Sequence, residues 1–97
     1  MAAEFDPKKN ALNLRKHAVS LSEGDGVLND PLALTTEDTE AEGEQRFVTI
    51  GVNIFGSVMV VAWTMVVAWT PRGEGNERII SVRKAEPKER RSYEEGV

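Results

Sequence analysis

The sequence predicts an α+β fold with two N-terminal helices, an antiparallel sheet of three to four strands and a C-terminal helix. Two observations support this prediction. Signals that start helices occur near both ends of the chain, and runs rich in β-branched residues, separated by turn residues, fill the middle. A chain of 97 residues is long enough for one modest core, so residues 1–97 are expected to form a single domain.

The N-terminal part of the chain predicts two helices. Asp6 supplies an N-cap and Pro7 occupies the first helical position, and a short apolar stripe follows, with Lys16 and His17 in the last turn. A second helix is expected to begin at residues 20–23 and to end at Asp30-Pro31. Its two glycines, Gly24 and Gly26, each weaken it by roughly 1 kcal/mol relative to alanine.

The strands are expected to follow these helices. Residues 32–36 predict a short strand and residues 37–44 an acidic loop, and residues 46–52 predict a second strand. After a turn at residues 53–57, a long β-branched run over 58–70 predicts the other arm of a hairpin. A loop over 71–76 precedes a strand at residues 78–83, and Glu86-Pro87 opens a helix through Tyr93. Such an order predicts helices on one face of the sheet.

The long run contains an internal duplication, since residues 59–64 and 65–70 both read MVVAWT. Six is an even number, so the alternation of side chains along a strand survives the repeat, and both copies are expected to present the same face. We predict a long hairpin strand rather than a looped-out copy. Full extension adds about 20 Å of apolar strand, which exposes an edge unless something covers it.

Composition excludes several kinds of site. The chain has no cysteine, which excludes disulfides and thiolate metal sites, and its one histidine excludes a multi-histidine centre. We therefore expect no metal and no cofactor. Charged residues near the N-terminus argue against a signal peptide, so the cytoplasm is the expected location. The charge-free residues 47–70 raise the alternative of a membrane helix, which the abundant valine and the internal Asn53 and Gly56 disfavour.

Charge is segregated along the chain. The net charge is −4, and residues 22–45 contain many carboxylates and no lysine or arginine. Basic residues gather in the first helix and, more densely, from Arg78 to Arg91. A chain that is acidic overall can still attract a polyanion through a local basic face. The alternative is that these charges only solvate the surface.

Four blocks of sequence, in order, resemble the BrnT family of type II toxin–antitoxin toxins. The most specific is IISVRKAEPKERRSYEEG (residues 79–96). The others are DPKKNALNLRKHAVS (6–20), DPLALTTED (30–38) and EQRFVTIG (44–51). The chain departs from the family pattern at Ala18, where a glycine is usual after the histidine, in the glycine-rich second helix, and in the MVVAWT duplication.

The resemblance implies a RelE-like fold and a metal-independent endoribonuclease that inhibits translation, with RNA as its substrate. It also implies neutralisation by a BrnA-like antitoxin that carries a ribbon-helix-helix domain, with operator DNA bound only through the antitoxin. A homodimer and a heterotetramer with the antitoxin both stay open. The duplication motivates an alternative, a catalytically degenerate homologue that only binds antitoxin and contributes to repression of the operon.

Four residues are predicted to serve catalysis. Arg83 is the strongest, because it matches the family's Ser-x-Arg position and a guanidinium can grip phosphate with two hydrogen bonds; the alternative is an ion pair with Glu89. Arg46, at the start of its strand, is the second. His17 is the only side chain that ordinarily exchanges a proton near neutral pH, although a helix-ending histidine is more often structural. Tyr93 is a candidate proton donor, with packing on the sheet as its alternative.

Four further cations are predicted to contact RNA phosphates: Lys16, Arg78, Lys84 and Arg90. For Arg90, and for its neighbour Arg91, the antitoxin or solvent is an alternative partner. Trp63 and Trp69 could stack on bases, but their shared parity with methionine and valine favours core packing. The basic segment from Ile79 to Tyr93 is therefore predicted to form the RNA-facing surface.

Overall fold

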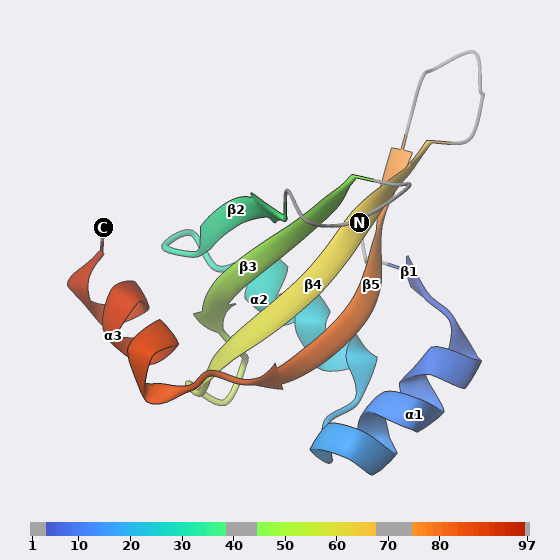
Figure 1. Cartoon of the computed structure of the whole chain (residues 1–97), viewed down its shortest axis with the longest axis horizontal. Helices are drawn as coiled ribbons and strands as arrows, with labels where there is room; N and C mark the ends of the chain where they lie inside the picture. The colour runs from blue at the N-terminus through green and yellow to red at the C-terminus, as the bar shows by residue number, and fades with distance from the viewer. Residues whose placement is uncertain (1–3, 39–44, 68–74, 97) are drawn as a thin grey trace.

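The computed structural model describes residues 4–38, 45–67 and 75–96, and it confirms an α+β architecture built on one sheet (Figure 1). The elements follow in the order β1 (Glu4–Phe5), α1 (Pro7–His17), η1 (Leu21–Glu23), α2 (Gly24–Leu28), β2 (Leu34–Asp38), β3 (Arg46–Val52), β4 (Val58–Val67), β5 (Gly75–Lys84) and α3 (Pro87–Glu95). The two predicted N-terminal helices and the C-terminal helix are all present.

The sheet has five described strands in the order β1-β5-β4-β3-β2. β1 runs parallel to β5, and every other neighbouring pair is antiparallel. The expectation of three to four antiparallel strands is therefore wrong in number and in the direction of one strand. β1 has only 2 residues, so no alternating pattern could reveal it.

Predicted and observed boundaries agree best for β3, which spans the expected residues. β2 begins at Leu34 rather than at residue 32, and β5 begins at Gly75 rather than at residue 78. The second helix is a single 3₁₀ turn, η1, followed by the short α2. Gly24 has a packing role there, because a Cβ at this position would lie 2.9 Å from Ile79 Cδ1 and 3.0 Å from Val82 Cγ2.

The core lies between the sheet and the N-terminal helices. Its buried members share one face of β4 and β5 and meet residues that follow α1: Val19, Leu21, Val27, Met59, Val61, Ile79 and Val82. Trp63 is half-buried against this cluster, stacks on Phe47 with ring centroids 4.7 Å apart, and donates a hydrogen bond to Thr49. The prediction that Trp63 packs in the fold is confirmed; Trp69 lies outside the described residues.

α3 lies apart from α1 and α2, which corrects the expectation of helices on one face. Arg83 follows the core residue Val82, so alternation directs its side chain to the opposite face, where Glu89 of α3 binds it. Figure 1 shows the same separation, with α3 and α1 at opposite ends of the view. The C-terminal helix thus contacts the sheet at β3 and at the end of β5, away from the helices that cover the core.

The first copy of the duplication forms the centre of β4, and the strand continues into the second copy as far as Val67. Residues 58–63 pair with β3, and residues 59–67 pair with β5, so the described pairing with β5 extends four residues further, into the second copy. The predicted long strand is confirmed for these residues, and residues 68–70 lie outside the described part of the chain. The described part of the charge-free run therefore forms β3, a turn and β4. No helix of the described residues is long and apolar enough to cross a membrane.

Candidate functional site at the junction of α1 and β5

One buried side chain fixes the position of α1 on the sheet. Asn13 is 5% exposed, and its Nδ2 donates to the carbonyl oxygens of Val19 and Val82, at 2.8 Å each. Its Oδ1 accepts from the amide of Val82 at 3.2 Å. A buried amide that satisfies three hydrogen bonds is costly to move, because each lost partner would leave a desolvated polar group. α1 is therefore held in register with β5.

This attachment brings His17 and Arg83 together. His17 lies four residues after Asn13, on the same side of α1, and Arg83 directly follows Val82. The helix ends immediately afterwards, because Ala18 adopts a left-handed conformation with φ 58° and its amide donates to the carbonyl of Leu14. The chain thus leaves α1 at the point where it meets the end of β5.

A shallow groove of about 550 Å³ lies at this junction. The last turn of α1 forms one wall, and the end of β5 with the segment that leads into α3 forms the other. The lining residues are Arg15, Lys16, His17, Ala18, Arg83, Lys84 and Glu86. Four cations and one carboxylate surround the histidine, so the groove is suited to an anionic ligand. We call it the junction groove.

Arg83 is held by Glu89 in a two-pronged ion pair. Its two terminal nitrogens donate to the two carboxylate oxygens of Glu89, both at 2.8 Å. These hydrogen bonds raise the pKa of Arg83 above its usual value and lower the pKa of Glu89. The predicted alternative for Arg83, an ion pair across the strand–helix junction, is therefore formed. The Arg83 side chain is still 35% exposed, so it is accessible from the groove.

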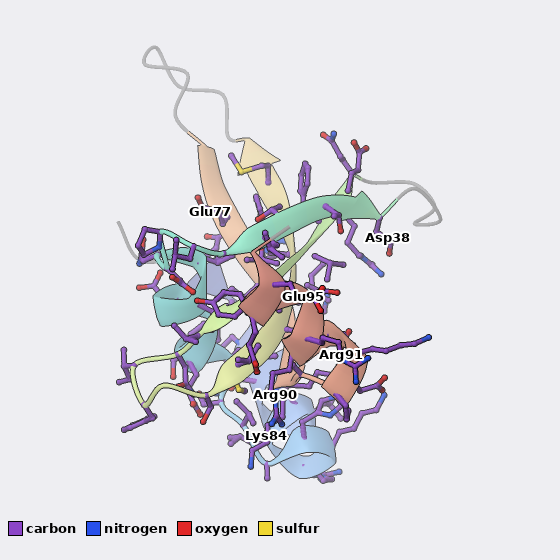
Figure 2. The ribbon with its side chains drawn as sticks, turned by 90° about the vertical axis from the view of Figure 1, so that its left-hand side faces the viewer. Asp38, Glu77, Lys84, Arg90, Arg91 and Glu95 are labelled. Carbon is purple, nitrogen blue, oxygen red and sulfur yellow. The ribbon has the colours of Figure 1, made fainter. Side chains whose placement is uncertain are left out.

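A second groove of about 390 Å³ adjoins the first. Lys84 lines both grooves, and Arg90 and Glu94 of α3 line the second together with Gly56 and Ser57 of the β3–β4 turn. Figure 2 shows the side chains of Lys84 and Arg90 close together below α3. The basic C-terminal segment therefore forms a connected surface from α1 to the β3–β4 turn. We call the second groove, which Lys84, Arg90, Glu94, Gly56 and Ser57 line, the turn groove.

Tyr93 lies elsewhere and joins α3 to the loop before β2. Its hydroxyl donates to Oδ2 of Asp30 at 2.5 Å, and this hydrogen bond raises the pKa of Tyr93. Burial raises the pKa of Asp30, but hydrogen bonds from Tyr93 and from the amides of Val52 and Leu32 outweigh burial and lower it. Tyr93 is not among the residues that line the junction groove.

The other predicted site residues lie toward the opposite end of the sheet. Arg46 is half-buried at the start of β3, where its Cα pairs with that of Asp38. Arg78 forms an ion pair with Glu4 of β1, at 3.2 Å. Four of the predicted site residues therefore line the junction groove: Lys16, His17, Arg83 and Lys84. Arg90 lines the adjoining turn groove, which shares Lys84 with the junction groove. The remaining three, Arg46, Arg78 and Tyr93, line neither groove.

Sequence reasoning did not select three residues that build this site. Arg15 lines the junction groove, and its place beside Lys16 and His17 is a signal that could have identified it. Asn13 carried no such signal, since one asparagine within a short helix does not show that it is buried. Glu89 was considered only as the alternative partner of Arg83, and the structure shows that it also accepts from the amide of Glu86.

Comparison with known proteins identifies a family for the chain. Residues 5–89 match the family model described as "Ribonuclease toxin, BrnT, of type II toxin-antitoxin system". No curated protein matches the chain. The match includes the whole junction groove, from Arg15 to Glu86. Within the described residues, no three histidine, aspartate or glutamate side chains are grouped so that they could hold a metal ion.

Proposed function

The chain belongs to the BrnT family of ribonuclease toxins of type II toxin–antitoxin systems, and we propose that its junction groove is a metal-independent endoribonuclease site. The observation that carries the proposal is the meeting of His17 with Arg15, Lys16, Arg83 and Lys84 in one open groove. A proton acceptor surrounded by phosphate-binding cations is the set of groups that RNA cleavage by the ribose 2′-hydroxyl requires.

The proposed reaction uses three of these groups. The imidazole of His17 accepts the proton of the 2′-hydroxyl as the 2′ oxygen forms a bond to phosphorus. The guanidinium of Arg83 stabilises the negative charge that develops on the phosphoryl oxygens. The bond from phosphorus to the 5′ oxygen breaks, and the ammonium of Lys84 protonates that oxygen. The products are a 2′,3′-cyclic phosphate and a 5′-hydroxyl end.

Arg83 must exchange partners during this cycle. Two oxygens of a phosphate can accept a pair of hydrogen bonds from the guanidinium, as the two carboxylate oxygens of Glu89 do, so a phosphate can replace Glu89 on Arg83. In free protein the ion pair holds Arg83 in an ordered position at the groove, and substrate competes for it. This competition is expected to raise KM and to leave the geometry of the transition state intact.

Family membership implies an antitoxin partner. We propose a BrnA-like antitoxin with a ribbon-helix-helix domain, through which the complex would reach operator DNA, in a heterotetramer or around a toxin homodimer. Cleavage of cytoplasmic RNA would inhibit translation whenever the antitoxin is depleted. The exposed cations of α3, Arg90 and Arg91, remain proposed contacts for RNA or for the antitoxin.

The ion pair of Arg83 favours a second function, that of a degenerate toxin which only binds antitoxin and adjusts repression. Deletion of residues 65–70 separates the two functions. If the shortened chain arrests growth and the full chain does not, the duplication has inactivated an enzyme. If neither chain arrests growth while both bind an antitoxin, the binding function is correct.

Growth after induced expression tests the proposal most simply. The full chain is expected to arrest growth, and Arg83→Ala to permit it while melting at a similar temperature. A toxic Arg83→Ala variant would remove Arg83 from the mechanism. An inert full chain that cleaves no RNA in vitro would contradict the enzymatic proposal as a whole.

A further inference from the structure

The β3–β4 turn presents two large apolar side chains to solvent. Ile54 is 81% exposed and Phe55 is 78% exposed, the two highest values among the large apolar residues of the described chain. Exposed apolar residues are common singly, whereas two adjacent ones at a tip form a contiguous apolar surface that a ligand could cover. The turn adjoins the polar, basic turn groove rather than another apolar surface.

The turn is held rigidly in this conformation. Oδ1 of Asn53 accepts hydrogen bonds from the amides of Phe55 and Ser57, at 2.9 Å each, and the amide of Asn53 donates to the carbonyl of Ser57. Nδ2 of Asn53 donates to Glu23 of η1, which ties the turn to the body of the protein. Gly56 supplies the positive φ of 81° that the turn needs. Such a turn loses little conformational entropy when a ligand binds.

The surroundings of Phe55 suit a nucleotide. Gly56 and Ser57, which follow it, line the turn groove opposite Lys84 and Arg90. Two cations against the single carboxylate of Glu94 leave the groove with a positive balance. Phe55 itself does not line the groove, but it directly precedes Gly56 at the rim. Proteins hold single-stranded nucleic acid by stacking bases on aromatic side chains beside a groove whose cations contact the backbone.

We infer that Phe55 is a stacking platform for an unpaired base of the RNA, so that the strand runs from the turn groove past Lys84 into the junction groove. This inference rests on the proposed function and adds a residue that positions the substrate. A protein partner is less compatible with the surroundings of the turn, because the adjoining groove is lined mainly by polar atoms.

The binding of a fluorescent RNA of roughly ten nucleotides, 2′-O-methylated throughout so that it cannot be cleaved, tests the inference. Fluorescence anisotropy of the purified full chain gives Kd. Phe55→Ala and Phe55→Leu are expected to raise Kd about tenfold, and Phe55→Trp to keep it within about twofold, since leucine is apolar but has no π face. Ile54→Ala is the matched control, with a change below about twofold.

Salt dependence separates stacking from charge. Lys84→Ala is expected to reduce the slope of log Kd against log salt by about one, whereas Phe55→Ala leaves the slope unchanged. Because Phe55 is exposed, its variants should melt like the unaltered chain, which circular dichroism checks.

Each of the following outcomes would overturn the inference. If the Phe55→Leu variant binds RNA as tightly as the unaltered chain, Phe55 does not act by stacking. The same conclusion follows if Ile54→Ala loses as much affinity for RNA as Phe55→Ala. Phe55 variants that lose antitoxin binding but retain RNA binding assign the tip to the protein partner. If the unaltered chain cleaves RNA and the Phe55 variants bind normally, only this inference fails; if the unaltered chain neither binds nor cleaves RNA, the proposed function fails with it.

Discussion

The two ends of the β4–β5 hairpin are both antiparallel strand pairs, but different elements surround them. At one end, Lys84 and Arg83 pair with Met59 and Val60, and α1, α3 and the β3–β4 turn lie around them. At the other end, residues 64–67 of β4 pair with Gly75–Arg78, beyond the residues of β4 that pair with β3. The elements that pack around the strand ends, rather than the strands themselves, create the junction groove.

The duplicated hexapeptide shows the same contrast within one strand. Met59 opens the first copy and is 1% exposed in the core, whereas Met65 opens the second copy and is 44% exposed. Both share the parity that predicts one buried face, yet a bulge between Ala62 and Trp63 interrupts the pairing with β5. Identical local sequence therefore gives different burial, because burial depends on the tertiary neighbours.

The largest expected effect compares two arginines on β5. Arg83→Ala is expected to slow RNA cleavage about 10²- to 10³-fold, because it removes the cation that stabilises the phosphoryl charge. Arg78→Ala is the matched control, since Arg78 also lies on β5 and forms an ion pair, but at the far end. It is expected to change the rate less than about threefold, as a surface ion pair contributes little. Single-turnover cleavage rates of the two variants on the same RNA measure these effects. If both variants lose the same fraction of the rate, the assignment of catalysis to the Arg83 end of β5 is wrong.

The two methionines provide the next comparison. Met59→Ala is expected to lower the free energy of unfolding by about 2–5 kcal/mol, because it leaves a cavity in the core. Met65→Ala is expected to lower it by less than about 1 kcal/mol. Urea denaturation of both variants checks this difference. If Met65→Ala costs as much as Met59→Ala, the second copy is buried in solution.

A smaller effect is expected from Glu89→Gln, which leaves Arg83 without its charged partner. Because the folded-state pKa of Glu89 is lowered, its contribution to stability is present above the ordinary titration of a glutamate and is lost as pH falls through the lowered pKa. We expect a loss of about 0.5–1 kcal/mol near neutral pH that disappears in acid. Denaturation at several pH values measures it, and RNA should bind Glu89→Gln more tightly. Weaker RNA binding would show that Glu89 orders Arg83 for substrate instead of competing with it.

Ala18→Gly gives the smallest expected change and reverses a departure from the family pattern. Ala18 has a φ of 58°, a conformation that costs an alanine roughly 1 kcal/mol and a glycine little. The substitution is therefore expected to raise the melting temperature by a few degrees. An unchanged or lower melting temperature would show that the left-handed conformation of Ala18 does not destabilise the end of α1.

Much of the fold could be predicted from local signals. The Asp6-Pro7 and Glu86-Pro87 helix starts and the alternation in β3 placed three elements correctly. β1 has no sequence pattern of its own, because its 2 residues exist as a strand only by pairing with β5. The position of α3 likewise depends on two tertiary contacts that its residues make, that of Glu89 with Arg83 and the long-range hydrogen bond of Tyr93 to Asp30.

The residue types of the candidate site could be predicted from the sequence, but their arrangement in space could not. The charge pattern and the resemblance selected His17, Arg83 and Lys84, which line one groove. They also selected Arg46 and Arg78, which lie toward the other end of the sheet. Residue type alone cannot separate these groups. The separation follows from the register of β5 and from the three hydrogen bonds of Asn13.

The ends of the RNA products test the central claim most directly. Purified chain acting on a single-stranded RNA is expected to produce 2′,3′-cyclic phosphate and 5′-hydroxyl ends, identified by mass spectrometry. His17→Asn is expected to reduce their formation at least about a hundredfold. Products with 3′-hydroxyl and 5′-phosphate ends, or full activity of His17→Asn, would contradict a junction groove in which His17 activates the 2′-hydroxyl.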